Sequence, residues 1–326
     1  RLIQAYYSGG AGAGQPIVLA ATAPTDVAIV DPSTRMSLGA GYGAATAPHG
    51  SHNLAYWSRA FGAWGQYDSN GNAATTDRDL GGFITGVDGA LGGGWRAGLA
   101  TGYTYTGLDA DARASSASIN SYVLGGYAGG AVGDVALRSG GTWTWHDIDT
   151  SRAVIFPGFF ESESANYNGD TGQLFAELAY PIFTHGGLVE PFAGLAYVHV
   201  GTDGFTESGP IAALTSAGSD TNVGYGTLGA RVGSTMVWGG TTLIPHASLA
   251  WQYALGDVTP LRTLAFASTG IGMGIGGVPL AQNSALLDIG ADVLVGPDAT
   301  LGLSYMGQYA GDVQDNGLRG RFNWRY

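Results

Sequence analysis

Long stretches of this sequence alternate between large apolar residues and small or polar ones. In 135–145, one set of alternate positions holds Val135, Leu137, Trp143 and Trp145, and the other holds Ala136, Arg138, Thr142 and Thr144. The same alternation recurs in 243–253 and in 301–309. Successive side chains of a strand point to opposite faces, whereas a helical face repeats about every 3.6 residues. The pattern therefore predicts an all-β protein built from two-faced strands.

Twelve such segments follow one another along the chain. They begin near Trp57, Gly81, Trp95, Ser118, Val132, Gly172, Leu188, Val223, Thr241, Leu286, Thr300 and Gly317. Their connections alternate between short glycine-rich turns (92–94, 129–130, 185–187, 239–240, 296–298) and long polar stretches (68–79, 109–116, 147–167, 201–222, 256–284, 311–316). Tight turns favour residues that tolerate positive φ or preset φ. An even number of long strands, with short turns at one end and long loops at the other, predicts a transmembrane antiparallel up-and-down β-barrel of 12 strands.

The composition supports a membrane barrel over a soluble sandwich or propeller. Charged residues make up 12% of the chain, although 45% of it is apolar. A soluble domain carries about 25% charged residues, whereas Arg or Lys on a lipid-facing strand costs about 2–4 kcal/mol at the bilayer midplane. The chain also has 57 glycines. We expect those inside strands, such as Gly86 and Gly98, to make room for a segment inside a narrow barrel and to permit its curvature.

Charged residues of the strands are expected to face the pore. The predicted pore-lumen set is Arg59, Arg96, Arg138, Glu177, Arg231, Asp288, Asp292, Arg319, Arg321 and Arg325, with Asp88 and Glu190 on the same side. These groups would hydrate the pore and hold a linker that passes through it. In the last strand, Phe322, Trp324 and Tyr326 alternate with arginines. That order indicates aromatic residues at the membrane edge and guanidiniums in a wet lumen.

Several functional classes are disfavoured. A net charge of −12, with 13 Arg and no Lys, argues against nucleic-acid binding. The chain has no Cys, and its six His include no HxxxH or HExxH pair, so we expect no metal and no cofactor. It lacks a G-x-S-x-G motif. A G-x-G-x-x-G match at 272–277 falls in a predicted loop and carries no weight. The residues that could form a catalytic cluster at the rim are His146, Asp147, Asp149, His199 and Asp203; we favour loop anchoring for them and predict no enzyme.

Eight segments of the chain, in order, resemble the translocator β-domain of autotransporters, the type V secretion proteins. They are 57–65, 82–89, 95–98, 143–152, 189–199, 256–260, 299–305 and 321–326. The resemblance implies a monomeric twelve-stranded barrel in the outer membrane of a Gram-negative bacterium, with its long loops facing the cell surface. It implies an N-terminal passenger that the barrel anchors and helps to export. It also places His146 and Asp147 at the start of a surface loop.

The resemblance further implies partners. The outer-membrane lipid and lipopolysaccharide would surround the barrel, and the barrel-assembly machinery would fold it. That machinery would read the C-terminal strand, with Phe322, Trp324 and Tyr326 as the assembly signal. A porin, or an enzyme with an active site at the rim, remains the alternative. Deleting the N-terminal segment distinguishes a translocator from a porin. The conductance of a translocator pore should rise on deletion, and that of a porin should not change.

We expect two parts, a passenger remnant and pore-threading linker at 1–55 and the barrel at 56–326. Pro16, Pro24 and Pro32 interrupt the first part, so a long helix is disfavoured there. A helical turn starting near Asp31 or Ser33 is the best local candidate for a plug. Some autotransporters release their passenger by Asn cyclisation in the linker. Here the Asn before the first strand is followed by Leu54, so we predict no such cleavage.

Overall fold

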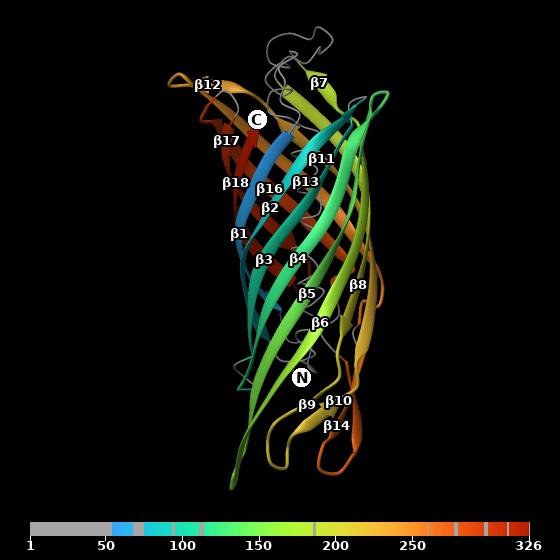
Figure 1. The fold of residues 1–326 in the computed structure, drawn as a ribbon. Coiled ribbons are helices and arrows are strands. Elements are labelled where there is room, and N and C mark those ends of the chain that lie inside the picture. Colours follow the sequence, from blue (N-terminus) through green and yellow to red (C-terminus); the bar gives the residue numbers. More distant parts are fainter. Residues whose placement is uncertain are drawn as a thin grey trace.

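The computed structural model describes residues 54–67, 75–92, 95–110, 114–184, 187–259, 261–276, 280–296, 299–311 and 313–325. In this part of the chain, twelve long antiparallel strands form a barrel (Figure 1). They are β1 (Leu54–Tyr67), β2 (Thr76–Gly92), β3 (Trp95–Ala110), β4 (Ser115–Val132), β5 (Val135–Phe156), β6 (Phe159–Ala179), β8 (Gly187–Thr202), β11 (Ser219–Gly233), β13 (Thr241–Gly256), β16 (Asn283–Leu294), β17 (Ala299–Tyr309) and β18 (Val313–Arg325). The predicted fold class is confirmed. The predicted linker and plug fall almost entirely on 1–53, outside the described residues.

The barrel closes because its first and last strands pair. Strand β1 pairs antiparallel with β2 on one side and with β18 on the other, so that Trp57 lies opposite Gly86 and Asn323. Each remaining long strand pairs with its neighbours in chain order, through β8–β11 and β11–β13 to β17–β18. Closure removes the free strand edges that a long meander would otherwise expose.

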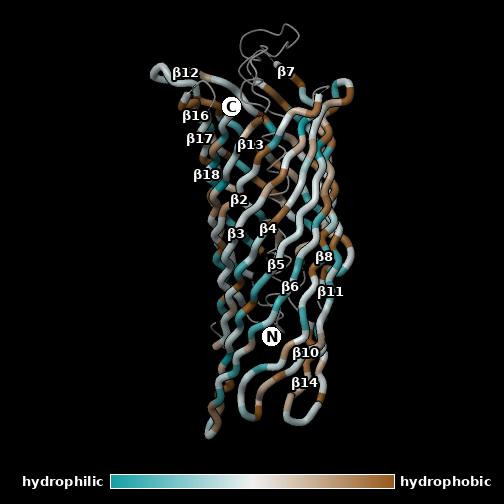
Figure 2. Tube along the Cα trace, viewed as in Figure 1, coloured by the Kyte–Doolittle hydropathy of each residue, from teal (hydrophilic) through white to brown (hydrophobic). Residues whose placement is uncertain are grey.

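The two faces of the wall differ in the way that the alternation predicts. On β5, Trp143 and Trp145 are exposed, whereas Arg138 and Thr144 are completely buried. Along the barrel strands, hydrophilic and hydrophobic positions alternate (Figure 2). Large apolar side chains thus cover the outside, and polar side chains are enclosed. None of the described residues forms a helix of the length and hydropathy needed to cross a membrane.

The predicted loop at 147–167 is wrong. Strands β5 and β6 continue through it as a hairpin, with Pro157 and Gly158 at the turn. Many of the polar residues that indicated a loop, such as Asp147 and Asp149, occupy the outer face of this hairpin, whereas Ile148 and Tyr167, together with Thr150 and Glu163, occupy its buried face. Because the outer face is polar here, polarity alone did not distinguish strand from loop. His146 and Asp147 accordingly lie within β5 and not at the start of a loop.

Two further long connections contain a small second sheet. Within the described residues it has the order β15-β14-β10-β9, formed by β9 (Phe205–Thr206), β10 (Leu214–Ser216), β14 (Leu261–Phe266) and β15 (Gly272–Gly276). Phe205, Leu214 and Leu264 pack against the inner faces of β3 to β6. Figure 1 shows β9, β10 and β14 at one end of the barrel. The short strands β7 (Ile182–Thr184) and β12 (Met236–Trp238) lie at the other end, where the tight turns are.

Candidate functional site: paired charges inside the barrel

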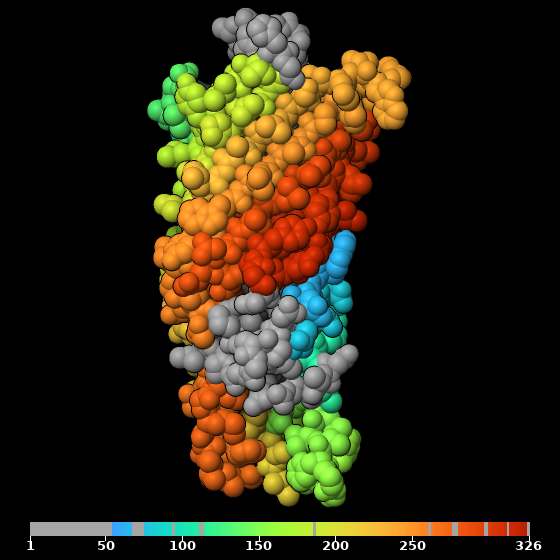
Figure 3. All heavy atoms as spheres, turned by 180° about the vertical axis from the view of Figure 1, so that it is seen from behind, coloured from blue at the N-terminus to red at the C-terminus, as the bar shows by residue number. Residues whose placement is uncertain are grey.

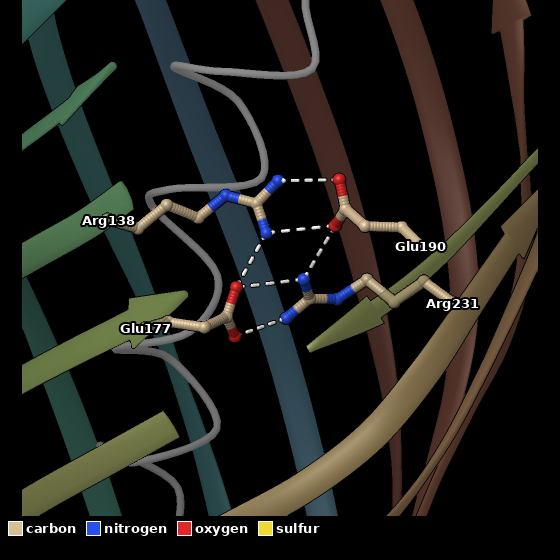
Figure 4. A network of polar contacts seen from close by, with 4 residues as sticks. All are labelled: Arg138, Glu177, Glu190 and Arg231. Carbon is tan, nitrogen blue, oxygen red and sulfur yellow. Dashed lines mark hydrogen bonds and ion pairs between the residues drawn. The ribbon is translucent and has the colours of Figure 1, made fainter. Parts of the chain in front are cut away.

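Four charged side chains from four strands meet inside the barrel (Figure 4). Arg138 of β5 lies opposite Glu177 of β6, and Glu190 of β8 lies opposite Arg231 of β11. Arg138 Nη1 donates to Glu177 Oε1 at 2.6 Å and to Glu190 Oε1 at 3.0 Å, and its Nη2 donates to Glu190 Oε2 at 3.1 Å. We call these four residues the charge tetrad.

The second arginine completes the tetrad. Arg231 Nη1 donates to Glu177 Oε1 and to Glu190 Oε1, both at 2.9 Å, and its Nη2 donates to Glu177 Oε2 at 2.5 Å. The Arg231 guanidinium also lies over the Phe192 ring, 3.9 Å from its centroid. Each carboxylate thus accepts bonds from both guanidiniums, an arrangement that the planar donor fork of arginine favours. The four charges sum to zero, which compensates the charge of Arg138, whose side chain is fully buried.

A second cluster joins β13, β16 and β18. Arg319 donates to Asp288, and Arg321 lies 3.3 Å from Asp292. His246 lies between the two acids, with Nε2 3.6 Å from Asp288 Oδ1 and Nδ1 3.5 Å from Asp292 Oδ2. Gly302 makes this possible, because a Cβ at that position would lie 1.9 Å from Asp292 Oδ1 and 3.2 Å from Arg321 Nε.

A third cluster lies on β1 to β4. Arg96 Nε donates to Asp88 Oδ1 at 2.5 Å, and the Tyr127 hydroxyl donates to Asp88 Oδ2 at 3.0 Å. Trp57 Nε1 donates to the Tyr127 hydroxyl oxygen at 2.5 Å. The guanidinium of buried Arg59 lies 5.3 Å from the Trp57 ring centroid. Rings and charges of this cluster therefore form one connected surface.

The structure brings most of the predicted pore residues together. Arg59, Arg96, Arg138, Glu177, Arg231, Asp288, Asp292, Arg319 and Arg321 lie on the inner side of their strands, and all nine belong to the three clusters. Arg325 ends β18, but its side chain and the whole of Tyr326 fall outside the described part. On the other face of β18, Trp324 is exposed and the Phe322 ring lies 6.2 Å from that of Tyr56. The roles assigned to these residues in export and assembly stay predictions.

Sequence reasoning missed the ion pairs Arg78–Asp315 and Arg152–Glu207 and several neutral partners. Arg78 of β2 donates to Asp315 of β18, across the intervening strand β1. Gly65 leaves the space for this contact, since a Cβ there would lie 2.0 Å from Asp315 Oδ1. Both residues fall within predicted long connections, 68–79 and 311–316, where a charge is expected in any case, so no signal distinguished them. The structure has these residues in β2 and β18 instead. Tyr127 and His246 could have been found as polar groups on the inner face of their strands.

The residues of the possible rim cluster lie apart. His146 is buried and hydrogen-bonds to Ser121 Oγ and Thr171 Oγ1, each at 2.8 Å. Asp147 and Asp149 lie on the exposed face and both accept from Asn166 Nδ2, at 3.0 and 2.9 Å. His199 contacts Asn222 and Asp220 on the neighbouring strand, and Asp203 lies beyond the end of β8. No arrangement of base, nucleophile and orienting acid is formed by these five residues.

Charged residues also fasten the small second sheet to the barrel strands. Arg152 donates through Nε and Nη2 to both oxygens of Glu207, at 2.8 and 2.6 Å. Arg262 donates to Ser216 and Thr202 and lies over the Phe205 ring. Burial raises the pKa of Glu163, the Arg152 charge opposes that shift, and Glu161 and Glu207 add to it. Among the residues that the structure describes, no group of three or more His, Cys, Asp or Glu is placed to hold a metal ion.

Comparison with known proteins identifies a family. Residues 56–306 match the family model for the autotransporter beta-domain. An extracellular serine protease of Serratia marcescens is 36% identical over 270 residues, which cover 83% of this chain and 26% of that protein. The esterase EstA of Pseudomonas aeruginosa is 29% identical over 167 residues, covering 48% of this chain and 25% of that protein. This chain spans about a quarter of the length of the curated relatives it matches.

Solved structures share the fold. The translocator domain of autotransporter NalP from Neisseria meningitidis superposes with a TM-score of 0.68 at 16% identity, covering 94% of this chain and 98% of that one. The beta domain of the Bordetella autotransporter Brka gives a TM-score of 0.64 at 19% identity, covering 84% and 100%. At these identities the likeness shows the architecture alone.

Proposed function

This chain belongs to the autotransporter β-domain family, and we propose that its paired interior charges form the surface along which a passenger segment passes. The chain is an outer-membrane translocator domain that anchors a passenger. The observation that carries the proposal is the charge tetrad, in which three buried charges and the part-buried Arg231, from four strands, neutralise one another.

A wall of charge-neutral pairs suits a pore through which polypeptide segments of varied sequence must pass. A fixed, unpaired charge in a narrow low-dielectric channel attracts segments of one sign and repels those of the other. A buried charge with no partner is also costly, whereas a neutral hydrogen-bonded group is tolerated. Paired guanidiniums and carboxylates therefore give a polar wall without a strong net field. Residues of the tetrad would act by shape and electrostatics and not by covalent chemistry.

The remaining parts of the proposal concern partners and orientation. We place residues 1–53 in the role of the threading segment, since they precede β1 and the family joins its passenger at that end. The long loops and the small second sheet would face the cell surface, and the short turns the periplasm. The barrel would act as a monomer in outer-membrane lipid and lipopolysaccharide. The barrel-assembly machinery would read Phe322, Trp324 and Tyr326.

We assign no catalysis to the barrel. The names of two relatives denote a protease and an esterase, and this chain matches about a quarter of each. His146 is held by Ser121 and Thr171 on the inner face, while the nearby acids lie on the outer face. An activity of the whole protein would then belong to its passenger.

Single-channel conductance in planar bilayers tests the proposal. Removing residues 1–53 leaves β1 intact, because that strand starts at Leu54, and should raise the conductance markedly. In the same shortened chain, Glu177→Gln with Glu190→Gln leaves two unneutralised arginines and should shift the pore toward anion selectivity. The matched control, Asp147→Asn with Asp149→Asn on the outer face, should leave selectivity unchanged. An unchanged conductance after the deletion would instead favour a porin.

A further inference from the structure

The short-turn end of the barrel carries large apolar side chains at its edge. Leu91, Val132, Phe183 and Val295 are all exposed there, each at or next to a short connection between consecutive strands. A rim that projected into water would be expected to carry polar turn residues. Apolar residues at this level instead suit the boundary between lipid headgroups and acyl chains.

The hairpin formed by β12 and the start of β13 is the most pronounced part of this rim. Met236, Val237 and Trp238 pair with Leu243, Thr242 and Thr241. Gly239 and Gly240, with φ of 58° and 82°, form the tight turn between them. The hairpin extends away from the barrel wall in Figure 1, and it projects beyond the wall in the opposite view of Figure 3.

This hairpin is exposed on both faces. Successive residues of a strand point to opposite sides, yet Val237 and Trp238 each expose 76% of their surface and Met236 exposes 50%. The long strands of the barrel enclose one face over most of their length, and the short strand β7 at the same end shares the two-sided exposure. The stretch from Ser234 to Pro245 contains no charged residue. Its apolar surface is continuous with the lipid-facing wall, where Val232 of β11 and Leu249 of β13 are also exposed.

We propose that the β12–β13 hairpin inserts into the phospholipid leaflet at the short-turn end and acts as an interfacial anchor of the barrel. Tryptophan favours the membrane interface, because its ring is apolar and its N–H needs a wet partner. Threonines and glycines at the tip suit the headgroup layer. Lipid also explains exposure on both faces, since acyl chains and headgroups can surround a hairpin that lies in the interface plane. A docked protein would need to cover both faces of a narrow hairpin.

Site-specific fluorescence tests the anchor. The chain has no Cys, so Val237→Cys gives a single attachment point for an environment-sensitive dye such as NBD. The control is Asp134→Cys in the Gly133–Asp134 turn, a polar position at the same end. Both proteins are folded into dioleoylphosphatidylcholine vesicles with and without spin-labelled phosphatidylcholine, and folding is checked by heat-modifiable gel mobility. Quenching at 237 should exceed that at 134 by roughly twofold or more, with emission shifted to the blue.

Equal quenching and equal emission at the two positions would overturn the proposal. A second measurement distinguishes lipid from protein. A photo-crosslinking residue at 237, in outer-membrane fragments that contain the protein, should yield mainly lipid adducts. A single dominant protein adduct there would assign the hairpin to a protein partner and would also overturn the proposal.

Discussion

Removal of one arginine from the charge tetrad should destabilise the barrel strongly. Arg138→Gln retains a side chain of similar polarity but removes the positive charge. Glu177 and Glu190 then face each other with Arg231 as their common partner. Glu190 Oε2 also loses the hydrogen bond that Arg138 Nη2 donates to it at 3.1 Å. The substitution therefore leaves an excess negative charge at a site where both carboxylates are at least 96% buried.

The expected loss follows from that burial. Two unit charges about 4 Å apart interact by about 4 kcal/mol at an effective dielectric of about 20. Deleting one partner of a buried ion pair costs about 3–5 kcal/mol, because the other charge remains without compensation. We expect Arg138→Gln to lower the free energy of unfolding by this amount. Adding Glu177→Gln restores neutrality, and the coupling between the two changes should be about 1–3 kcal/mol.

Equilibrium urea unfolding in dilauroylphosphatidylcholine vesicles, followed by tryptophan fluorescence, measures these values. The matched control is Asp147→Asn, which removes a charge from the outer face of the same strand and should change stability by no more than about 0.5 kcal/mol. A loss below about 1 kcal/mol for Arg138→Gln would show that water in the pore screens the tetrad. Strict additivity of the two substitutions would show that the residues do not act as a unit.

Three further changes probe other parts of the wall. Gly302→Ala should cost about 1–3 kcal/mol, because the new methyl would meet Asp292 Oδ1 at 1.9 Å, whereas Gly226→Ala has open space and should be nearly neutral; urea unfolding compares them. Leu264→Ala should loosen the small second sheet by about 2–5 kcal/mol, detected as faster proteolysis there while the heat-modifiable mobility of the barrel persists. Burial raises the pKa of Glu163, so its contribution to stability is present at low pH and is lost as pH rises through that raised pKa. Hydrogen exchange in β6 and β9, corrected for its intrinsic pH dependence, should show this loosening, and Glu163→Gln should abolish it.

The barrel itself was predictable from alternation, because a membrane wall imposes one rule on every strand. Where the rule changes, prediction failed. In 147–167 the outer face is polar, and the buried face mixes Ile148, Ala165 and Tyr167 with Thr150 and Glu163, so the apolar-outside alternation is lost and the stretch resembled a loop. The signal that was available is Pro157-Gly158, a dipeptide that marks turns. A hairpin centred on that dipeptide would extend β5 and β6 to the ends that the structure shows.

The tetrad was predictable in part. A hairpin centred on Pro157-Gly158 places Arg138 opposite Glu177, because antiparallel partners are equidistant from the turn. The other pair, Glu190 and Arg231, spans the long connection at 201–222. That connection contains strands of the small second sheet, so its length does not fix the register of β8 against β11. Pairing there depends on the packed structure and not on a local turn signal.

The glycines show how an aromatic-rich wall can line a narrow pore. Gly86 lies opposite Trp57, and a Cβ there would lie 2.5 Å from the indole Cζ2. Gly98 lies opposite Tyr127, and a Cβ there would lie 2.6 Å from the phenol Cζ. Each ring therefore occupies the space over a glycine of the adjacent strand, where a larger residue would force it toward the centre of the pore. Against the wall, Trp57 Nε1 donates to the Tyr127 hydroxyl oxygen, and that hydroxyl donates to Asp88 Oδ2. Glycine inside these strands thus lets neighbouring rings lie against the wall. Any substitution that displaces these rings would both narrow the pore and break their hydrogen-bond network.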